Sequence, residues 1–182
     1  LLLVLKPVHQ DRCVQQVRFI SSTVDDLNFV SAGADGALQA WKFDFESSNT
    51  EMLWNHKAHA SGINCIDIRK TSGVLSIISG GDDGFVSITQ VVNDKITSFY
   101  SRQCHVSSVS SVCFLPLDDF CSTVLSVSID RSVVLYDSSQ SLQEISSRKC
   151  VISDISAITL DKANNLTVYG MGQESFSLQK IV

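Results

Sequence analysis

The feature that most constrains the fold is a repeat of forty-odd residues that runs along the chain. Four segments align when the sequence is laid over itself, and they span 29–41, 77–89, 124–136 and 168–179. Their equivalent positions are Asp35, Asp83, Asp130 and Gln173, which are separated by 48, 47 and 43 residues. Such a period is typical of repeat proteins, in which each supersecondary unit buries its apolar surface against its neighbours. The sequence therefore predicts four similar units in a row.

Within each unit, short runs alternate between apolar and polar residues, which predicts β-strands rather than helices. The predicted strands are 14–20, 28–32, 38–43 and 51–54 in unit one, 63–68, 75–79, 85–89 and 95–100 in unit two, and 109–114, 123–128, 133–137 and 142–147 in unit three. Four strands per repeat are typical of a propeller blade.

The turn between the second and third strands of a unit carries its own signal. Asp35-Gly36 and Asp83-Gly84 occupy this position, where a tight hairpin needs positive φ angles that Gly and Asp tolerate. Asp130-Arg131 occupies it in unit three, where arginine suits such a turn less well. The prediction is a tight hairpin at the same place in all three units.

A set of polar and aromatic residues recurs around these turns. It consists of Ser31, Asp35 and Trp41 in unit one, His59, Ser79 and Asp83 in unit two, and His105, Ser126, Asp130 and Tyr136 in unit three. On these residues the units resemble WD repeats. In that family a histidine before the first strand, a Ser or Thr in the second, the turn Asp and a Trp in the third form a structural hydrogen-bond network, and the resemblance implies the same role here.

The match to the repeat pattern is uneven. Thr89 stands at the Trp position of unit two, His9 is displaced by one residue relative to its strand, and unit four keeps neither the His nor the Asp. The closing Trp-Asp dipeptide is degenerate in every unit, as Trp41-Lys42 illustrates. These departures put the network of unit four in doubt.

The resemblance implies an all-β fold, a WD-repeat β-propeller of about four four-stranded blades that forms the C-terminal part of a larger propeller. The predicted blades are 6–56, 57–103, 104–149 and 150–182, and residues 1–5 are predicted to be the outer strand of a preceding blade. The last blade lacks its own outer strand, because closed WD-repeat rings commonly borrow that strand from the N-terminal end. The missing strand is therefore expected upstream of Leu1.

His59, Ser79 and Asp83 are also the residue types of a nucleophilic triad. The set recurs at His105, Ser126 and Asp130 with closely similar spacing, and a repeated arrangement serves the fold of the repeat rather than one active site. The histidines and cysteines lack the paired short spacings of a zinc site. The glycine-rich stretch 80–84 lacks the Lys and helix that cradle phosphate. No catalytic residue, metal or cofactor is predicted.

Charge and cysteine usage limit the kinds of partner and the cellular compartment that we expect for this chain. The 182 residues carry 14 basic and 19 acidic side chains, a net charge of −5, which argues against non-specific attraction to nucleic acid or membranes. The longest aliphatic run, Leu1 to Leu5, is too short to span a bilayer. Six cysteines without a C-x-x-C pair predict free thiols in a reducing compartment. We expect a cytoplasmic protein without membrane partners.

Propellers mostly present rigid loops to partners, so the leading functional class is a non-catalytic interaction scaffold. Four short stretches, 58–67, 126–131, 152–155 and 170–173, are similar to the WD-repeat partner subunits of tRNA anticodon-loop 2′-O-ribose methyltransferases. That resemblance implies a regulatory subunit that binds the methyltransferase and helps position tRNA for methylation of the wobble nucleotide. The alternative is a protein-assembly adaptor in a ubiquitin ligase, ribosome-assembly or membrane-coat complex.

Some side chains outside the repeat pattern are candidate contacts. Trp54, Phe99, Tyr100 and Phe120 are suited to stacking or to anchoring a partner, although such residues more often cover the outer strand of a blade. The dibasic pairs Arg69-Lys70 and Arg148-Lys149 are candidate nucleic-acid contacts, with a solvated loop as the alternative.

Overall fold

The computed structural model describes residues 8–22, 26–115, 123–150, 155–160, 166–170 and 176–178. In this part of the chain the elements are β-strands and two short 3-10 segments, His9–Asp11 and Ser138–Gln140. The predicted all-β architecture is confirmed. The predicted strand at 1–5 and the repeat position Gln173 lie outside the described residues.

The strands form successive antiparallel sheets, each made from one continuous stretch of chain. Sheet one contains β1 (Val14–Ser22), β2 (Asp26–Gly33), β3 (Ala37–Asp44) and β4 (Asn49–Lys57). Sheet two contains β5 (Ile63–Thr71), β6 (Val74–Gly81), β7 (Phe85–Val92) and β8 (Lys95–Gln103). Sheet three contains β9 (Val109–Phe114), β10 (Thr123–Ser128), β11 (Ser132–Asp137) and β12 (Gln143–Lys149), and the described strands of sheet four are β13 (Ile155–Leu160), β14 (Leu166–Gly170) and β15 (Phe176–Leu178).

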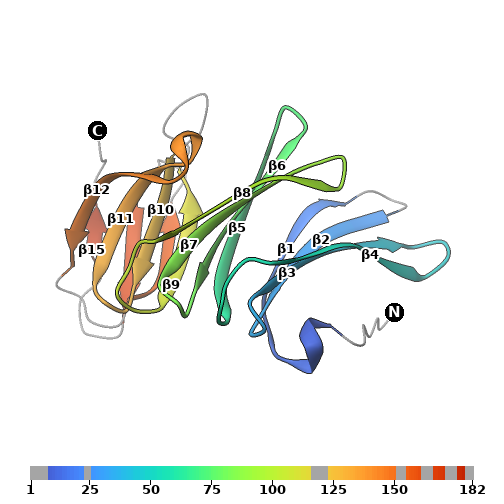
Figure 1. Cartoon of the computed structure of the whole chain (residues 1–182), viewed down its shortest axis with the longest axis horizontal. Helices are drawn as coiled ribbons and strands as arrows, with labels where there is room; N and C mark the ends of the chain where they lie inside the picture. The colour runs from blue at the N-terminus through green and yellow to red at the C-terminus, as the bar shows by residue number, and fades with distance from the viewer. Residues whose placement is uncertain are drawn as a thin grey trace.

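The sheets stand side by side in chain order, as leaves of an open array (Figure 1). Within each sheet the strands are ordered as they are in the sequence, so every connection inside a sheet is a hairpin. This is the arrangement of propeller blades, and the arc is not closed into a ring by the described strands.

Several strands are longer than the sequence pattern predicted. β8 continues to Gln103, beyond the predicted end at Tyr100, because Arg102 and Gln103 still pair with Val86 and Phe85 after the apolar alternation stops. Leu142, predicted to begin the last strand of unit three, instead lies in the preceding turn with φ 61° and is fully buried. In β8, hairpin pairing therefore extends past the residues that carry the hydrophobic signal, whereas β12 begins one residue later than predicted.

Three apolar clusters form the core, and each lies between two neighbouring sheets. The first joins sheets one and two, the second joins sheets two and three, and the third joins sheet three to Ile155 of sheet four. Ile77 and Ile78 are adjacent on β6, yet Ile77 belongs to the first cluster and Ile78 to the second. Successive side chains of a strand point to opposite faces, so a central blade is apolar on both faces.

The first strands of the sheets are linked by polar contacts as well. The side chain of Gln16 on β1 accepts a hydrogen bond from the Ile66 backbone N–H on β5 at 2.5 Å. Asp67 on β5 accepts one from the Phe114 N–H on β9 at 2.9 Å, although burial raises the pKa of this carboxyl. The Arg69 guanidinium lies 4.2 Å from the centre of the Phe114 ring. These contacts satisfy groups that apolar packing between sheets leaves unpaired.

The Asp-containing hairpins need backbone angles that favour glycine. Gly36 and Gly84 have φ angles of 77° and 76°, and Arg131 adopts 69° at the same position of sheet three. A Cβ added to Gly84 would lie 2.5 Å from the carbonyl oxygen of His105. Glycine is therefore required in sheet two by both angle and space, whereas sheet three accepts the left-handed conformation in a residue that disfavours it.

Replacing Arg131 by glycine is expected to raise the free energy of unfolding by about 1 kcal/mol, because glycine adopts the left-handed angle without steric cost. Urea denaturation of the full chain measures the change. Gly84→Ala is the matched control and should lower stability. Equal or lower stability of Arg131→Gly would show that its side chain contributes more than its backbone angle costs.

Candidate functional site

The most organised polar site of sheet two is a buried network around His59. His59 comes from the segment between β4 and β5, Ser79 from β6, and Asp83 from the turn between β6 and β7. The His59 Nδ1 lies 3.0 Å from Asp83 Oδ1, and Nε2 lies 2.9 Å from Ser79 Oγ. Because a carboxylate only accepts, Nδ1 carries the proton and Nε2 accepts from the serine hydroxyl. The structure thus brings together the three residues that the sequence grouped.

Sheet one contains the same network and adds a histidine that the sequence left out of register. His9 Nδ1 lies 2.9 Å from Asp35 Oδ1, and His9 Nε2 lies 2.8 Å from Ser31 Oγ. Trp41 completes it by donating from Nε1 to Ser31 Oγ at 3.0 Å. The extra residue before β1 is taken up in the short 3-10 segment, where His9, Gln10 and Asp11 all have positive φ angles.

Sheet three has a modified network. His105 Nε2 lies 2.7 Å from Ser126 Oγ, but Nδ1 contacts Ser132 Oγ at 2.6 Å and is 3.6 Å from Asp130 Oδ2. The Ser132 hydroxyl in turn hydrogen-bonds to Asp130. The sequence grouped His105 directly with Asp130, whereas the structure inserts Ser132 between them.

Close packing against the histidine ring explains the difference. A Cβ added to Gly33 would lie 2.3 Å from His9 Cγ, and one added to Gly81 would lie 2.4 Å from His59 Nδ1. The equivalent residue of sheet three is Ser128, two positions after the network serine. A Cβ at this position would overlap a ring placed as those of His9 and His59 are, so we attribute to Ser128 the longer His105–Asp130 separation, which the Ser132 hydroxyl bridges.

The third-strand position differs in each sheet. Tyr136 is fully buried, its hydroxyl lies 3.2 Å from Ser126 Oγ, and burial raises its pKa. Thr89 is also fully buried, but its Oγ1 has no hydrogen-bond partner among the described residues. Threonine is too short to reach Ser79 as Trp41 reaches Ser31, so the network of sheet two lacks this member.

The electrostatics of the networks favour charged aspartates. Burial alone would raise the pKa of Asp83, but hydrogen bonds from His59 and from the Phe85 and Ala60 N–H groups outweigh it and lower that pKa. In sheet three, burial is likewise outweighed by hydrogen bonds from Ser132 and the Val106 N–H, and the pKa of Asp130 falls to about 2.

The His105 ring responds in the opposite way. Burial lowers its pKa even though the Asp130 carboxylate raises it, so the ring is neutral at pH 7. Neutral histidine and ionised aspartate are therefore joined by hydrogen bonds in this network rather than by a full ion pair.

Each network also ties one sheet to the next. The Gly36 carbonyl in the hairpin turn of sheet one accepts hydrogen bonds from the N–H groups of Ala58 and His59, and the Gly84 carbonyl accepts from Cys104 and His105. Lys57 and Lys149 donate to the carbonyls of Asp35 and Asp130. Lys57 follows Asp35 by 22 residues and Lys149 follows Asp130 by 19 residues. Because the two spacings differ, the repeat pattern of the sequence does not show that both lysines bind the carbonyl of a turn aspartate.

His59, Ser79 and Asp83 have the connectivity of a nucleophilic triad, with Nε2 on the serine and Nδ1 on the aspartate. Ser79 and Ser126 are fully buried and Ser31 is 4% exposed, so these hydroxyls are closed to a substrate. Ser31 Oγ also accepts from Trp41. The arrangement supplies hydrogen bonds to buried polar groups and locks the turn geometry.

We also searched the part of the chain that the structure describes for metal sites, membrane-spanning helices and reactive thiols. It holds no group of three or more His, Cys, Asp or Glu side chains placed to bind a metal ion, and no helix of the length and apolarity that crossing a membrane requires. Cys13, Cys65, Cys104, Cys113 and Cys150 are free thiols, and burial raises the pKa of both Cys65 and Cys113 to about 12. Cys121 lies outside the described residues.

Comparison with known proteins agrees with this geometry. The family model "WD domain, G-beta repeat" matches residues 50–89 and 96–137. The WD40 β-propeller domain of Doa1 superposes with a TM-score of 0.66 and 16% identity, covering 86% of this chain and 47% of that one. With its blades and histidine networks, the chain contains WD40 repeats and folds as part of a β-propeller.

A particular relative can also be named. The chain is similar to the tRNA (34-2'-O)-methyltransferase regulator WDR6 of Drosophila melanogaster, with 26% identity over 149 residues. The match covers 77% of this chain but only 15% of the relative.

Gly81→Ala is expected to lower the free energy of unfolding by about 1–3 kcal/mol, because the added methyl group overlaps the His59 ring. Urea denaturation measures the loss. In a His59→Ala background the same substitution should cost less, since the ring is absent and only the Asp83 carboxylate, whose Oδ1 lies 2.6 Å from the added Cβ, remains close to it. Equal costs in the two backgrounds would disprove the proposed steric conflict.

Asp130→Asn is expected to remove part of the acid sensitivity of the fold. The pKa of Asp130 is about 2 in the fold against an ordinary 3.8, so its stabilisation is present above pH 4 and is lost as the pH falls toward 2. The variant should be less stable at pH 7, and its unfolding free energy should change less between pH 4 and 2. Denaturation at several pH values measures this, with the exposed Asp11→Asn as control. An unchanged acid slope would contradict the assignment.

Proposed function

We propose that this chain is part of a cytoplasmic, non-catalytic regulatory scaffold that binds a tRNA 2′-O-ribose methyltransferase and helps position tRNA for methylation of wobble nucleotide 34. The observation that carries the proposal is the similarity, over 77% of the chain, to a protein named as the regulator of such an enzyme. Because the chain spans only 15% of that relative, the proposal concerns a contribution to the larger protein's function.

The buried networks support a scaffold role. Their histidines, serines and aspartates are occupied in joining β-strands and hairpin turns, and the serine hydroxyls are enclosed. The partner enzyme would supply the methyl-donor site and the reacting groups. This chain would contribute a rigid surface, whose shape is set by the packing between blades.

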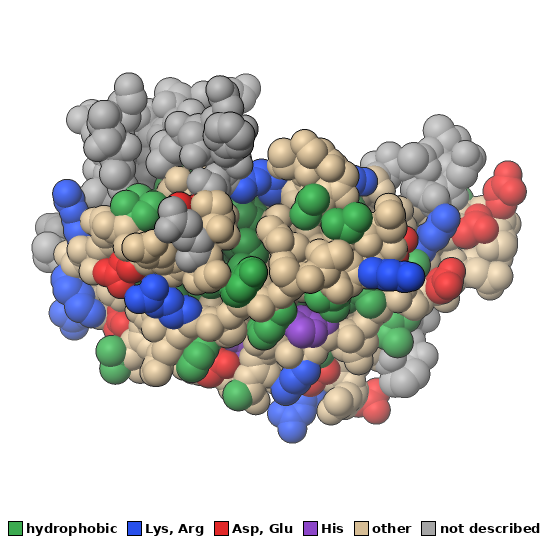
Figure 2. Space-filling view, turned by 45° about the horizontal axis from the view of Figure 1, so that its top comes forward, with side chains coloured by type: hydrophobic (Ala, Val, Ile, Leu, Met, Phe, Trp, Pro, Cys, Tyr) green, Lys and Arg blue, Asp and Glu red, His purple; other side chains and the backbone are tan. Residues whose placement is uncertain are grey.

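Charge is unevenly distributed over that surface. Acidic side chains gather at the end of the molecule where the β3–β4 hairpin projects, with a few Lys and Arg beside them, and several Lys and Arg side chains, with acidic ones among them, lie at the opposite end (Figure 2). The acidic hairpin includes Asp44, Glu46 and Glu51. Arg131 lies in the turn before β11, and β11 pairs with the part of β12 that carries Arg148 and Lys149. Phosphate contacts with tRNA are expected at this basic corner rather than at the acidic hairpin.

Disrupting the gene that encodes this chain is expected to reduce 2′-O-methylation at tRNA nucleotide 34, because the methyltransferase would lose its positioning subunit. Mass spectrometry of nucleosides from purified tRNA measures the effect, and ribose methylation at other tRNA positions is the internal control. Re-expression of the intact gene should restore the modification. Unchanged methylation at nucleotide 34 would overturn the proposal.

Affinity purification of the tagged full-length protein distinguishes the alternative class. Recovery of a ribose methyltransferase together with tRNA supports the proposal. Recovery of a ubiquitin ligase, ribosome-assembly or membrane-coat core, without a methyltransferase, would identify a protein-assembly adaptor instead.

A further inference from the structure

We propose that a cleft between sheets one and two binds an extended segment of a partner polypeptide, with an aliphatic side chain on the cleft floor and a basic residue at its rim. This site is independent of the proposed tRNA function, since any partner protein that carries such a segment would fit it. The inference rests on the lining of the cleft, on one unpaired polar atom and on the charge at the rim.

The cleft has a volume of about 340 Å³ and is lined by both sheets. Its apolar residues are Leu75 and Val91, which belong to the core cluster between these sheets, and Ile20, Leu53 and Trp54, which are partly buried and pack against that cluster. The volume lies within the range of sites that take a small ligand or a side chain. The floor is therefore a continuation of the hydrophobic core that opens to solvent.

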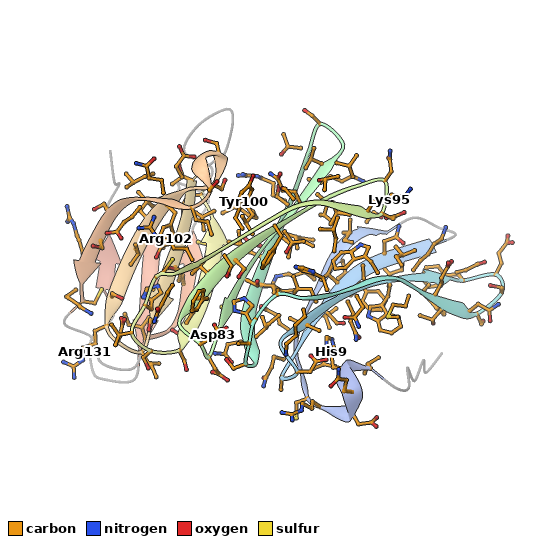
Figure 3. All side chains as sticks on the ribbon, in the orientation of Figure 1. His9, Asp83, Lys95, Tyr100, Arg102 and Arg131 are labelled. Atoms are coloured by element: carbon orange, nitrogen blue, oxygen red, sulfur yellow. The ribbon has the colours of Figure 1, made fainter. Side chains whose placement is uncertain are left out.

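The cleft lies away from the histidine networks. Its rim includes Gly73 in the β5–β6 hairpin turn and Asn93 and Asp94 in the β7–β8 turn. Figure 3 shows Lys95, the next residue, on the edge of the molecule opposite His9, Asp83 and Arg131. Substitutions at this rim can therefore be made without touching the networks that hold the blades together.

An unpaired acceptor on a residue that lines the cleft points to a ligand with an N–H group. Asn28 lines the cleft and donates from Nδ2 to Ser21 Oγ at 3.2 Å. Its Oδ1 atom is buried and has no hydrogen-bond partner among the residues that the structure describes. Buried polar atoms are nearly always paired, and leaving one unpaired is costly. A backbone amide of a bound peptide would supply the missing donor.

The rim charges favour a polypeptide over a nucleic acid. The Asp94 carboxylate and the Asn28 Oδ1 atom both accept hydrogen bonds, and Lys70 is the only cation among the lining residues that the structure describes. A phosphodiester backbone brings acceptors and negative charge, which Asp94 would repel. A peptide brings N–H donors for Asn28, carbonyl groups for Lys70 and a basic side chain for Asp94.

Two substitutions test the site while preserving the turn conformations. Asp94 has a φ angle of 58°, which asparagine also tolerates, so Asp94→Asn removes the charge alone. Gly73 has a φ angle of 82°, and a Cβ there meets no atom within 4 Å. Gly73→Asn therefore adds a side chain to the cleft wall at a position with open space. Glu46→Gln, in the exposed turn of the β3–β4 hairpin and not among the lining residues of the cleft, is the matched charge control.

The experiment is selection of a phage-displayed library of random 12-residue peptides on the immobilised full chain. We expect enriched peptides to share an aliphatic residue next to a Lys or Arg. Synthetic peptides of this sequence should bind Asp94→Asn and Gly73→Asn at least about fivefold more weakly than the unmodified chain, and Glu46→Gln equally well. Isothermal titration measures the affinities, and urea denaturation checks that each variant is folded.

Three outcomes would overturn the proposal. One is the absence of a shared motif among selected peptides, and another is unchanged affinity for both cleft variants. The third is that a fluorescein-labelled 12-nucleotide oligouridine binds the unmodified chain and loses affinity for the cleft variants, which would make the cleft a nucleic-acid site. None of these results depends on whether the gene is needed for tRNA methylation.

Discussion

The structure depends on each central sheet burying both of its faces against neighbouring sheets. On β6, Ile77 and Ile78 are both fully buried but enter different clusters. The hydrophobic stabilisation of one blade therefore comes from contacts with two others, and it is lost if either neighbour is displaced. This constraint explains why the sheets form a side-by-side array, and why the chain has several clusters between sheets instead of one central core.

Packing sheets in this way places polar hairpin and loop groups next to apolar surfaces. The histidine networks are the local solution, because they provide partners for side chains that water cannot reach. His59 lies in the segment that connects sheet one to sheet two. Its backbone N–H donates to the Gly36 carbonyl of sheet one, and its side chain hydrogen-bonds to Ser79 and Asp83 of sheet two. The same few residues therefore fix a hairpin and set the position of one blade relative to the next.

The residue types that often serve catalysis have a structural role in these networks, and this affects where a functional surface is to be expected. In this chain the His and Ser side chains of the networks are buried where blades meet, so function is more readily sought on the surfaces between hairpins. The basic corner near Arg148 and the cleft beside Trp54 are two such surfaces, with different chemistry. The first suits phosphate groups and the second suits a peptide.

The sequence by itself determined the blade architecture, because the repeat, the alternating strands and the Asp-Gly turns are local signals that survive without knowledge of contacts. It also grouped Ser79 with Asp83 and His59, since their spacing recurs in the next unit. Only the tertiary structure brought His9 into register, inserted Ser132 between His105 and Asp130, and left the Asn28 Oδ1 atom without a partner among the described residues. These features depend on how a 3-10 turn absorbs one residue, on whether a Cβ stands beside a ring, and on how two sheets diverge. The serine at 128 in place of glycine is visible in the aligned repeats, but its effect on the His105 ring, like the other distances, is set by packing between segments far apart in sequence.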